Sequence, residues 1–268
     1  MPAPKNLFKQ TLKEGRAQIG LWQALANPYT VEICAGAGYD WLLIDAEHAP
    51  NDMPLLVAQL QAMKGTASHA VIRPPIGETY IVKQLLDIGA QTLLIPMVDS
   101  RDLAETMVRA VRYPPQGVRG VGAALARASA FNRIPDYLQT ANDEICLLLQ
   151  VESRAGLAAL DAIASTDGVD GVFIGPADLA ADMGFLGKPG APEVQAAVEA
   201  ALLRIQSHGK AAGILTGDPA LARRYLDLGA TFVAIGNDVT LLANATSQLL
   251  RDFEKACPAS GAASGRVY

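Results

Sequence analysis

The sequence predicts an α/β fold made of eight repeated strand–helix units. Eight short apolar runs alternate along the 268 residues with segments whose apolar residues have helical spacing. The runs are almost continuously hydrophobic, which is typical of parallel strands buried on both faces. Eight such units in a chain of this length predict a single (β/α)8 TIM barrel, although a doubly wound parallel sheet would give a similar pattern.

The predicted strands are spaced so that a helix fits between each pair. In chain order they are Gln18–Trp22, Trp41–Asp45, Ala70–Arg73, Thr92–Pro96, Ile145–Glu152, Gly171–Gly175, Ala211–Leu215 and Phe232–Gly236. Helical spacing between them is clear in Leu103–Arg112 and Val194–Gln206. Three stretches, which begin at Gly36, Leu86 and Leu226, repeat one junction in which glycine ends a helix before a strand.

Two segments fall outside this repeat. Pro114–Asn132 is a long connection rich in Gly, Ala and Arg, and such a loop in a compact domain tends to be functional or to face a partner. Cys257–Tyr268 is small, polar and rich in Gly and Ser, which predicts a flexible tail. We therefore expect one barrel domain over residues 1–256 and a C-terminal tail over residues 257–268.

Composition excludes several classes of protein. The net charge of −5 and the absence of a basic stripe argue against a nucleic-acid partner. The N-terminus has no apolar signal region, and no apolar run approaches the roughly 18 residues that a membrane span needs. The three cysteines are scattered without a Cys-x-x-Cys pair, as in a reducing compartment. We expect a cytoplasmic protein that binds neither nucleic acid nor membrane.

Polar side chains close two consecutive predicted strands. Gln150 and Glu152 end one strand on the same face, and Asp178 follows the next strand after a Gly-Pro turn. Active sites of barrels lie at this carboxyl end of the strands. Two carboxylates with open positions suit Mg²⁺ or Mn²⁺, which retain water and accept substrate oxygens. In the structural alternative, Asp178 caps the following helix and Glu152 pairs with a nearby arginine.

Two further strand ends carry groups suited to acid–base chemistry. His48 lies within Asp-Ala-Glu-His at the end of a predicted strand and is a candidate general base. Arg73, which ends the next strand, could stabilise an enolate or bind a carboxylate. No lysine falls at a strand end of this kind, which argues against catalysis through a lysine Schiff base.

With these residues identified, the chain resembles the HpcH/HpaI aldolase family, and within it the metal-dependent 4-hydroxy-2-oxoheptanedioate aldolases, which are class II pyruvate aldolases. The likeness extends from about Asn6 to Phe253. It is carried by three long motifs, Trp41–Pro50, Arg112–Gly122 and Gly168–Leu179.

The resemblance implies a metal and substrate site at the barrel mouth. Glu152 and Asp178 would bind a divalent metal such as Mg²⁺, Mn²⁺ or Co²⁺. Gln150 and the Ala177-Asp178 segment would contact the pyruvate part of a 2-oxo acid. The last helix would pack on a neighbouring subunit of a homo-oligomer, commonly a trimer-based hexamer.

The resemblance also implies roles in catalysis. His48 would be the base, Arg73 the stabiliser of the transition state, and Asp87 the acid that raises the basicity of the histidine. Asp87 lies near the end of a predicted helix, at the opposite rim of the barrel from its own His48, so it could serve only a neighbouring subunit. Asp45, three residues before His48, is the alternative within one subunit.

The expected reaction is reversible retro-aldol cleavage of a 4-hydroxy-2-oxo acid to pyruvate and an aldehyde. One alternative is a CoA-thioester lyase of the citrate or malyl type, which would need an adenine-nucleotide groove that has no basic or aromatic signature in this sequence. The other is a metabolite-binding barrel without catalytic activity.

Overall fold

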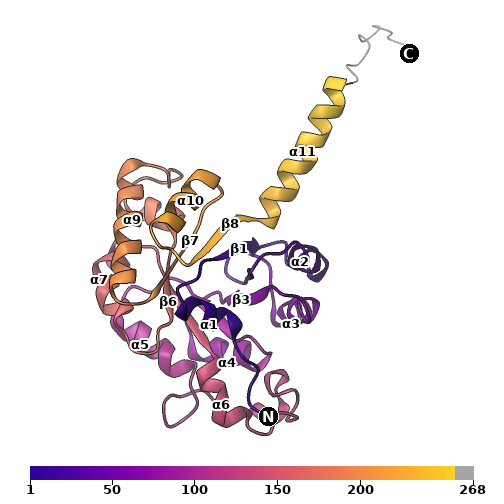
Figure 1. Cartoon of the computed structure of the whole chain (residues 1–268), viewed down its shortest axis with the longest axis vertical. Coiled ribbons are helices and arrows are strands. Elements are labelled where there is room, and N and C mark those ends of the chain that lie inside the picture. The colour runs from indigo at the N-terminus through magenta and orange to yellow at the C-terminus, as the bar shows by residue number, and fades with distance from the viewer. Residues whose placement is uncertain (257–268) are drawn as a thin grey trace, which may run out of the picture.

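The computed structural model describes residues 1–256, so the predicted tail, Cys257–Tyr268, lies outside it. Eight parallel strands form a closed barrel in chain order, and the last strand pairs with the first (Figure 1). The strands are β1 (Gln18–Gln23), β2 (Trp41–Asp45), β3 (His69–Arg73), β4 (Thr92–Ile95), β5 (Cys146–Val151), β6 (Gly171–Ile174), β7 (Ala211–Leu215) and β8 (Phe232–Asn237). The predicted barrel is confirmed, and the doubly wound alternative is wrong because that fold leaves an open sheet.

Helices alternate with the strands around the barrel. They are α1 (Leu7–Lys13), α2 (Pro28–Ala35), α3 (Met53–Ala62), α4 (Thr79–Asp87), α5 (Arg101–Ala110), α6 (Tyr137–Glu144), α7 (Arg154–Ala164), α8 (Pro176–Asp182), α9 (Pro192–Ser207), α10 (Pro219–Asp227) and α11 (Asp238–Ala256). The long connection predicted over Pro114–Asn132 contains two 3₁₀ turns, η1 (Ala123–Leu125) and η2 (Arg127–Ser129). None of the helices over residues 1–256 is long and apolar enough to cross a membrane.

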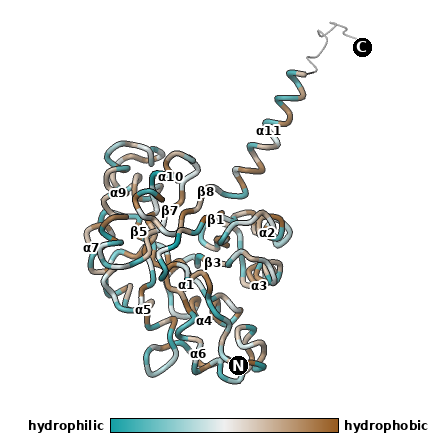
Figure 2. Tube along the Cα trace, viewed as in Figure 1, coloured by the Kyte–Doolittle hydropathy of each residue, from teal (hydrophilic) through white to brown (hydrophobic). Residues whose placement is uncertain are grey.

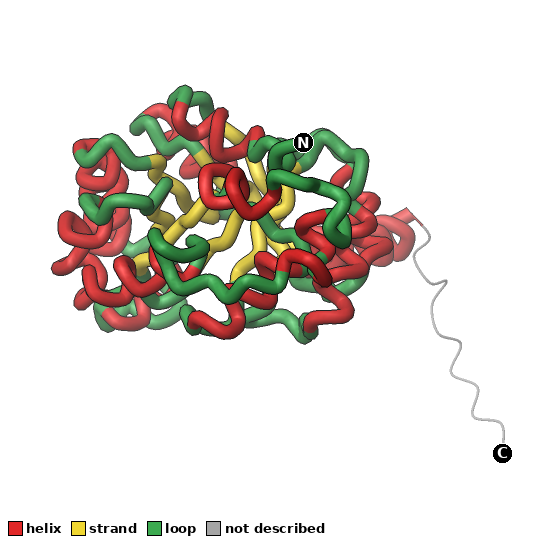
Figure 3. The backbone as a smooth tube through the Cα atoms, turned by 90° about the horizontal axis from the view of Figure 1, so that it is seen from below, coloured by secondary structure: helices red, strands yellow, loops and turns green. Residues whose placement is uncertain are grey.

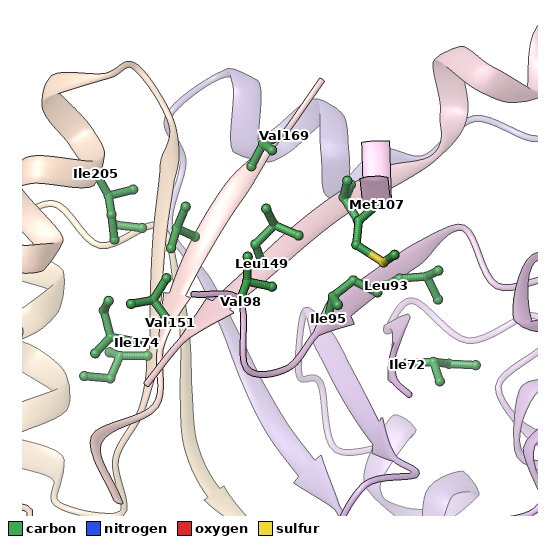
Figure 4. Close-up of a cluster of buried hydrophobic side chains, with 14 of the residues drawn as sticks. Ile72, Leu93, Ile95, Val98, Met107, Leu149, Val151, Val169, Ile174 and Ile205 are labelled. Atoms are coloured by element: carbon green, nitrogen blue, oxygen red, sulfur yellow. The ribbon is translucent and has the colours of Figure 1, made fainter. Parts of the chain in front are cut away.

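Alternate strand residues build two separate hydrophobic layers. One set points outward and packs under the helices, where Leu149 and Val151 of β5 lie near Ile174 of β6 (Figure 4). The other set points inward and includes Trp41, Phe173 and Phe232. The rings of Trp41 and Phe232 fit because each faces a glycine: a Cβ at Gly20 would lie 2.2 Å from Trp41, and one at Gly213 would lie 2.2 Å from Phe232.

Helix α1 closes the amino-terminal end of the barrel, as the view from below shows (Figure 3). Its Phe8 belongs to the interior layer and stacks on the His69 ring with the centroids 5.4 Å apart. His69 in turn shares a 2.7 Å hydrogen bond with Thr92. Since this end is plugged, ligands can reach the barrel only from the carboxyl ends of the strands.

Helix α11 does not fold back onto the barrel but extends away from it (Figure 1). Its first residue, Asp238, is buried and accepts hydrogen bonds from the backbone N–H groups of Ala24 and Leu25. Beyond this anchor, hydrophobic and hydrophilic residues alternate along the helix (Figure 2). Its large apolar side chains are exposed: Val239, Leu241, Leu242, Leu249, Leu250 and Phe253.

Candidate active site

The register of the barrel places charged residues of two neighbouring strands side by side. Asp45 closes β2 and is the direct pairing partner of Arg73, which closes β3. Across the barrel, β5 ends at Val151, so Glu152 is the first residue beyond the strand. Asp178 lies in the first turn of α8, directly after β6. The predicted site residues from β2, β3, β5 and β6 therefore share the carboxyl end of the barrel.

Arg73 is held in one orientation by two carboxylates. Its Nε donates to Asp45 Oδ1 at 2.9 Å and its Nη2 to Asp45 Oδ2 at 2.6 Å, while Nη1 lies 2.8 Å from Glu47 Oε2. The guanidinium carbon also lies 5.0 Å from the centroid of the Trp22 ring, within cation–π range. The cation is thus buried but compensated, and it is fixed before any substrate binds.

The same contacts determine the charge of Asp45. Burial raises the pKa of its carboxyl, but the hydrogen bonds and positive charge of Arg73 outweigh burial and bring the pKa below its ordinary value. The indole of Trp22 and the backbone N–H of Glu47 donate to the same carboxylate. Asp45 is therefore an ionised clamp for Arg73.

Glu152 is a buried carboxylate without a cationic partner. Its Oε1 accepts a 2.9 Å hydrogen bond from the backbone N–H of Met97, and its Oε2 accepts one from the Gln150 amide. No Lys, Arg or His over residues 1–256 forms an ion pair with it, so the predicted structural alternative with an arginine is wrong. Burial raises its pKa, and the charges of Glu47 and Asp178 add to this effect.

Gly175 is required where the chain passes this carboxylate. A Cβ at that position would lie 2.3 Å from Glu152 Oε2 and 3.2 Å from Gln150 Nε2. The following helix, α8, begins without a side-chain cap, so the predicted capping role of Asp178 is also wrong. The exposed Asp178 carboxylate remains available to a ligand.

These residues fit a divalent cation. Burial makes the charged form of Glu152 costly, and Asp178 adds negative charge nearby. The buried Oε1 atom of Gln150 has no hydrogen-bond partner in the described part of the chain. No group of three or more His, Cys, Asp or Glu side chains over the described 256 residues has the geometry to hold a metal. A metal here would have two carboxylate ligands, which leaves positions for water and substrate, as Mg²⁺ and Mn²⁺ prefer.

His48 stands at the rim of this mouth and is largely free. Its side chain is 68% exposed, and its Nε2 lies 4.0 Å from Glu47 Oε2. The Asp45 carboxylate accepts a 3.4 Å hydrogen bond from the backbone N–H of His48 and also accepts hydrogen bonds from Arg73. Asp45 therefore contacts the backbone of His48 and not its imidazole, unlike the arrangement in which Asp45 orients the imidazole within one subunit.

The structure does not bring Asp87 to His48 within one chain. Asp87 is the last residue of α4, whereas His48 follows β2, and helices of a barrel run antiparallel to its strands. Asp87 instead pairs with Arg119 of the long loop. Glu47 and Arg119 are the charged groups to which the sequence assigned no role, since only the fold shows that each contacts a candidate catalytic residue.

The amino-terminal end of the barrel has surface hollows of its own. One of about 1140 Å³ is lined by Lys9, Lys210 and the Pro114-Pro115 turn, and one of about 780 Å³ is lined by His69 and Phe131. Neither includes a strand-end carboxylate of the mouth described above. The candidate site residues and these two hollows therefore lie at opposite ends of the barrel.

Charged side chains gathered at the carboxyl ends of the strands place this site where (β/α)8 enzymes have their active sites. Residues 18–245 match the family HpcH/HpaI aldolase/citrate lyase. The chain belongs to this family and is an enzyme, a carbon–carbon lyase.

Relatives and solved structures agree with this assignment. A hydroxypyruvate/pyruvate aldolase of Pseudomonas aeruginosa is 60% identical over 268 residues, which cover 100% of both chains. A 4-hydroxy-2-oxo-heptane-1,7-dioate aldolase of Salmonella dublin is 58% identical over 258 residues, 96% of this chain and 98% of that protein. The crystal structure of an HpcH/HpaI aldolase/citrate lyase family protein from Burkholderia cenocepacia J2315 superimposes with a TM-score of 0.90 at 42% identity, covering 93% of this chain and 100% of that one.

Proposed function

We propose that the protein is a metal-dependent class II pyruvate aldolase that reversibly cleaves 4-hydroxy-2-oxo acids to pyruvate and an aldehyde. The observation that carries this proposal is the buried Glu152 carboxylate, which has no cationic partner among residues 1–256 and shares one mouth with Asp178, Arg73 and His48. Substrates of this class include 4-hydroxy-2-oxoheptanedioate and 2-keto-3-deoxy sugar acids. The names of the relatives at 58–60% identity support the reaction class.

Glu152 and Asp178 would hold Mg²⁺, Mn²⁺ or Co²⁺. When bound, the cation supplies Lewis-acid polarisation of the 2-oxo group. Gln150 and the first turn of α8 would orient the pyruvate unit, because the Ala177 and Asp178 N–H groups have no acceptor within the helix.

Arg73 and His48 have separate proposed roles, charge stabilisation and proton transfer. The guanidinium of Arg73, already fixed by Asp45 and Glu47, stabilises the negative charge that develops on the enolate oxygen. His48 removes the proton of the 4-hydroxyl group, which starts cleavage of the C3–C4 bond, and later returns a proton to the pyruvate methyl carbon. Its exposure leaves it accessible to the substrate.

The neighbouring subunit has two proposed contributions. The exposed apolar side of α11 would pack against it, since an apolar surface of this kind marks an interaction site. Asp87 would reach the neighbour's His48 and raise its basicity. Both contributions require a homo-oligomer, for which we propose a trimer-based hexamer.

A pyruvate-release assay with purified protein tests the proposal. Cleavage of 4-hydroxy-2-oxo acids should require added Mg²⁺, Mn²⁺ or Co²⁺ and should stop when EDTA is added. Activity that persists in EDTA would overturn the metal-dependent reaction, and turnover of a CoA thioester instead would favour the citrate or malyl type of lyase. A protein that binds 2-oxo acids without turnover would be a metabolite-binding barrel.

Hydroxypyruvate is a second candidate substrate for the nucleophilic half of the reaction. Relatives from Pseudomonas aeruginosa and Deinococcus radiodurans, at 60% and 61% identity, are named hydroxypyruvate/pyruvate aldolases. Incubating the protein with one aldehyde and either pyruvate or hydroxypyruvate should give an aldol product from both donors if this relationship extends to the present chain. A product from pyruvate alone would exclude hydroxypyruvate.

A further inference from the structure

Arg119 is fully buried although it belongs to a surface loop. Its side chain is 0% exposed, and its Nη2 donates to Asp87 Oδ1 at 3.0 Å and to the Tyr137 hydroxyl at 3.4 Å. Its Nε and Nη1 are buried without a hydrogen-bond partner over residues 1–256. Burying a guanidinium with unsatisfied N–H groups destabilises a fold, so the arrangement calls for a reason other than stability.

Two tyrosine rings flank this cation without neutralising it. The guanidinium carbon lies 4.3 Å from the centroid of Tyr113 and 5.9 Å from that of Tyr137, within cation–π range. Burial raises the pKa of the Tyr113 phenol to about 12, so this ring stays uncharged at neutral pH. Asp87 is therefore the carboxylate that compensates Arg119.

Asp87 stands in an unfavourable place for an acid. It is the final residue of α4, where the helix dipole disfavours negative charge. Arg119 holds its Oδ1, while its Oδ2 faces the open side of Gly122, where a Cβ would lie 3.5 Å away. The Asp87 side chain is 27% exposed. Its Oδ1 is therefore held by Arg119, whereas its Oδ2 remains accessible.

We propose that Arg119 is a positioning residue, which holds the Asp87 carboxylate in one rotamer so that its second oxygen can accept the imidazole N–H of a neighbouring subunit's His48. The inference rests on the proposed aldolase function and on the shared site it requires. Arg119 itself touches no substrate. Its planar guanidinium, held between aromatic rings, fixes the carboxylate more rigidly than the flexible ammonium of a lysine could.

Arg127 of the same loop provides a matched control. It donates to the backbone carbonyls of Ile88 and Leu60, and so anchors the loop beside Asp87 without contacting that carboxylate. If Arg119 only anchored the loop, Arg119→Met and Arg127→Met would have similar effects on turnover.

Kinetics of the full-length, metal-loaded protein give the first test. Arg119→Met should lower kcat by about 10–100-fold, the usual effect of losing a group that orients a functional side chain. KM for the 2-oxo acid should stay unchanged, because the residues proposed to bind it belong to the barrel mouth. Arg119→Lys should recover part of the lost kcat, and Arg127→Met should retain turnover. Equal losses in the two methionine variants would overturn the positioning role.

Mixed oligomers give the second test, with differently tagged subunits copurified to verify assembly. A mixture of Arg119→Met and His48→Ala subunits should regain activity, because the first chain's His48 meets an intact Asp87–Arg119 pair on the second. A mixture of Arg119→Met and Asp87→Ala should not, because no subunit then carries an intact pair. If Arg119→Met does not assemble, Arg119→Lys replaces it in both mixtures.

The outcomes separate this inference from the proposed function. If Asp87→Ala is impaired while Arg119→Met has wild-type kcat, the Arg119 inference fails and the aldolase proposal stands. If Asp87→Ala retains full activity, the shared acid and its positioning residue both fail, but metal-dependent pyruvate release is unaffected. Absence of pyruvate release from the wild-type protein with every metal would overturn the function itself.

Discussion

At the mouth of the barrel, Arg73 is bound by Asp45 through two hydrogen bonds and by Glu47 through a third polar contact. An arginine held in this way stabilises charge without reorganising during the reaction, which is the main advantage of a preformed electrostatic site. In the proposed mechanism Asp45 therefore acts through Arg73, whose position it fixes.

Replacing Asp45 with asparagine should release this clamp. We expect kcat to fall by up to about 10²-fold, the cost of a small misplacement of a catalytic group, because one side of the guanidinium loses its charged acceptor. Steady-state kinetics measure the effect. Asp40→Asn is the control, since Asp40 precedes the other end of β2 and its carboxylate accepts a hydrogen bond from the Ile19 N–H, far from Arg73. Equal kinetics in wild type and Asp45→Asn would contradict the role of the clamp.

Replacing His48 with alanine should lower kcat by about 10²–10⁴-fold, the contribution of a positioned general base. His208→Ala is a suitable control, because His208 lies at the end of α9 and pairs with Asp161 rather than facing the mouth. Rapid-quench measurement of pyruvate formation would locate the loss in the chemical step. Undiminished turnover in His48→Ala would require another base.

Glu152→Ala and Asp178→Ala should each abolish measurable metal binding, because each removes one of the two carboxylates proposed as ligands. Calorimetric titration with Mn²⁺ measures this independently of activity, and circular dichroism checks that the barrel remains folded. Glu193→Ala, at the exposed start of α9, should bind metal like the wild type. Tight Mn²⁺ binding by either site variant would refute the ligand assignment.

At the scale of elements, α1 seals one end of the barrel through Phe8, His69 and Thr92. Burial lowers the pKa of His69 from 6.5 to about 4. The unfolded chain therefore takes up a proton on this residue at a higher pH than the folded chain does. The stabilising effect of the neutral imidazole is complete above pH 6.5 and is lost as pH falls from 6.5 towards 4.

Urea unfolding of wild type and His69→Gln across this pH range tests the coupling. The free energy of unfolding of the wild type should fall more steeply with decreasing pH, by up to about 1.4 kcal/mol per pH unit for one proton. Above pH 7 the two curves should run parallel. Identical slopes between pH 6.5 and 4 would show that His69 is not responsible.

Helix α11 is the element whose packing is least complete in one chain. Leu242, Leu249 and Phe253 recur on one side at helical spacing, and all three are exposed. If the proposed oligomer forms through this helix, replacing Leu249 and Phe253 together with aspartate should break it into smaller species in analytical ultracentrifugation. Asn244→Asp, on the opposite side of the helix, should leave assembly unchanged. Assembly that survives the double substitution would place the interface elsewhere.

At the scale of the whole molecule, the proposed site residues fall into two sets, one that lies within a single chain and one that depends on assembly. Glu152, Asp178 and Arg73 lie at one end of the barrel within one chain, whereas the role proposed for Asp87 requires a neighbouring subunit. A dissociated Leu249→Asp/Phe253→Asp variant should therefore still bind Mn²⁺ in calorimetry but lose most of its turnover. A dissociated form with wild-type kcat would show that each chain holds a complete site.

The local pattern of residues predicted eight strand–helix units and the polar strand ends, whereas closure of the sheet into a barrel was shown by the pairing of β1 with β8. Continuous apolar runs bounded by glycine are typical of parallel strands buried on both faces, and strand alternation places Gln150 and Glu152 on one face. The boundaries differ by only a few residues, as where β5 ends at Val151 instead of Glu152. These features follow from interactions between residues close together in sequence.

Tertiary structure decided which charges meet. The pairing of Asp45 with Arg73 depends on the register between two strands, and that of Asp87 with Arg119 on the path of a 19-residue connection over Pro114–Asn132. At the sequence level Asp87 was the acid implied by the family resemblance and Asp45 was the alternative within one subunit, because spacing along the chain does not reveal which partner occupies a carboxylate. The fold engages Asp45 with Arg73 and leaves one oxygen of Asp87 accessible, because side-chain partners are set by distance in space.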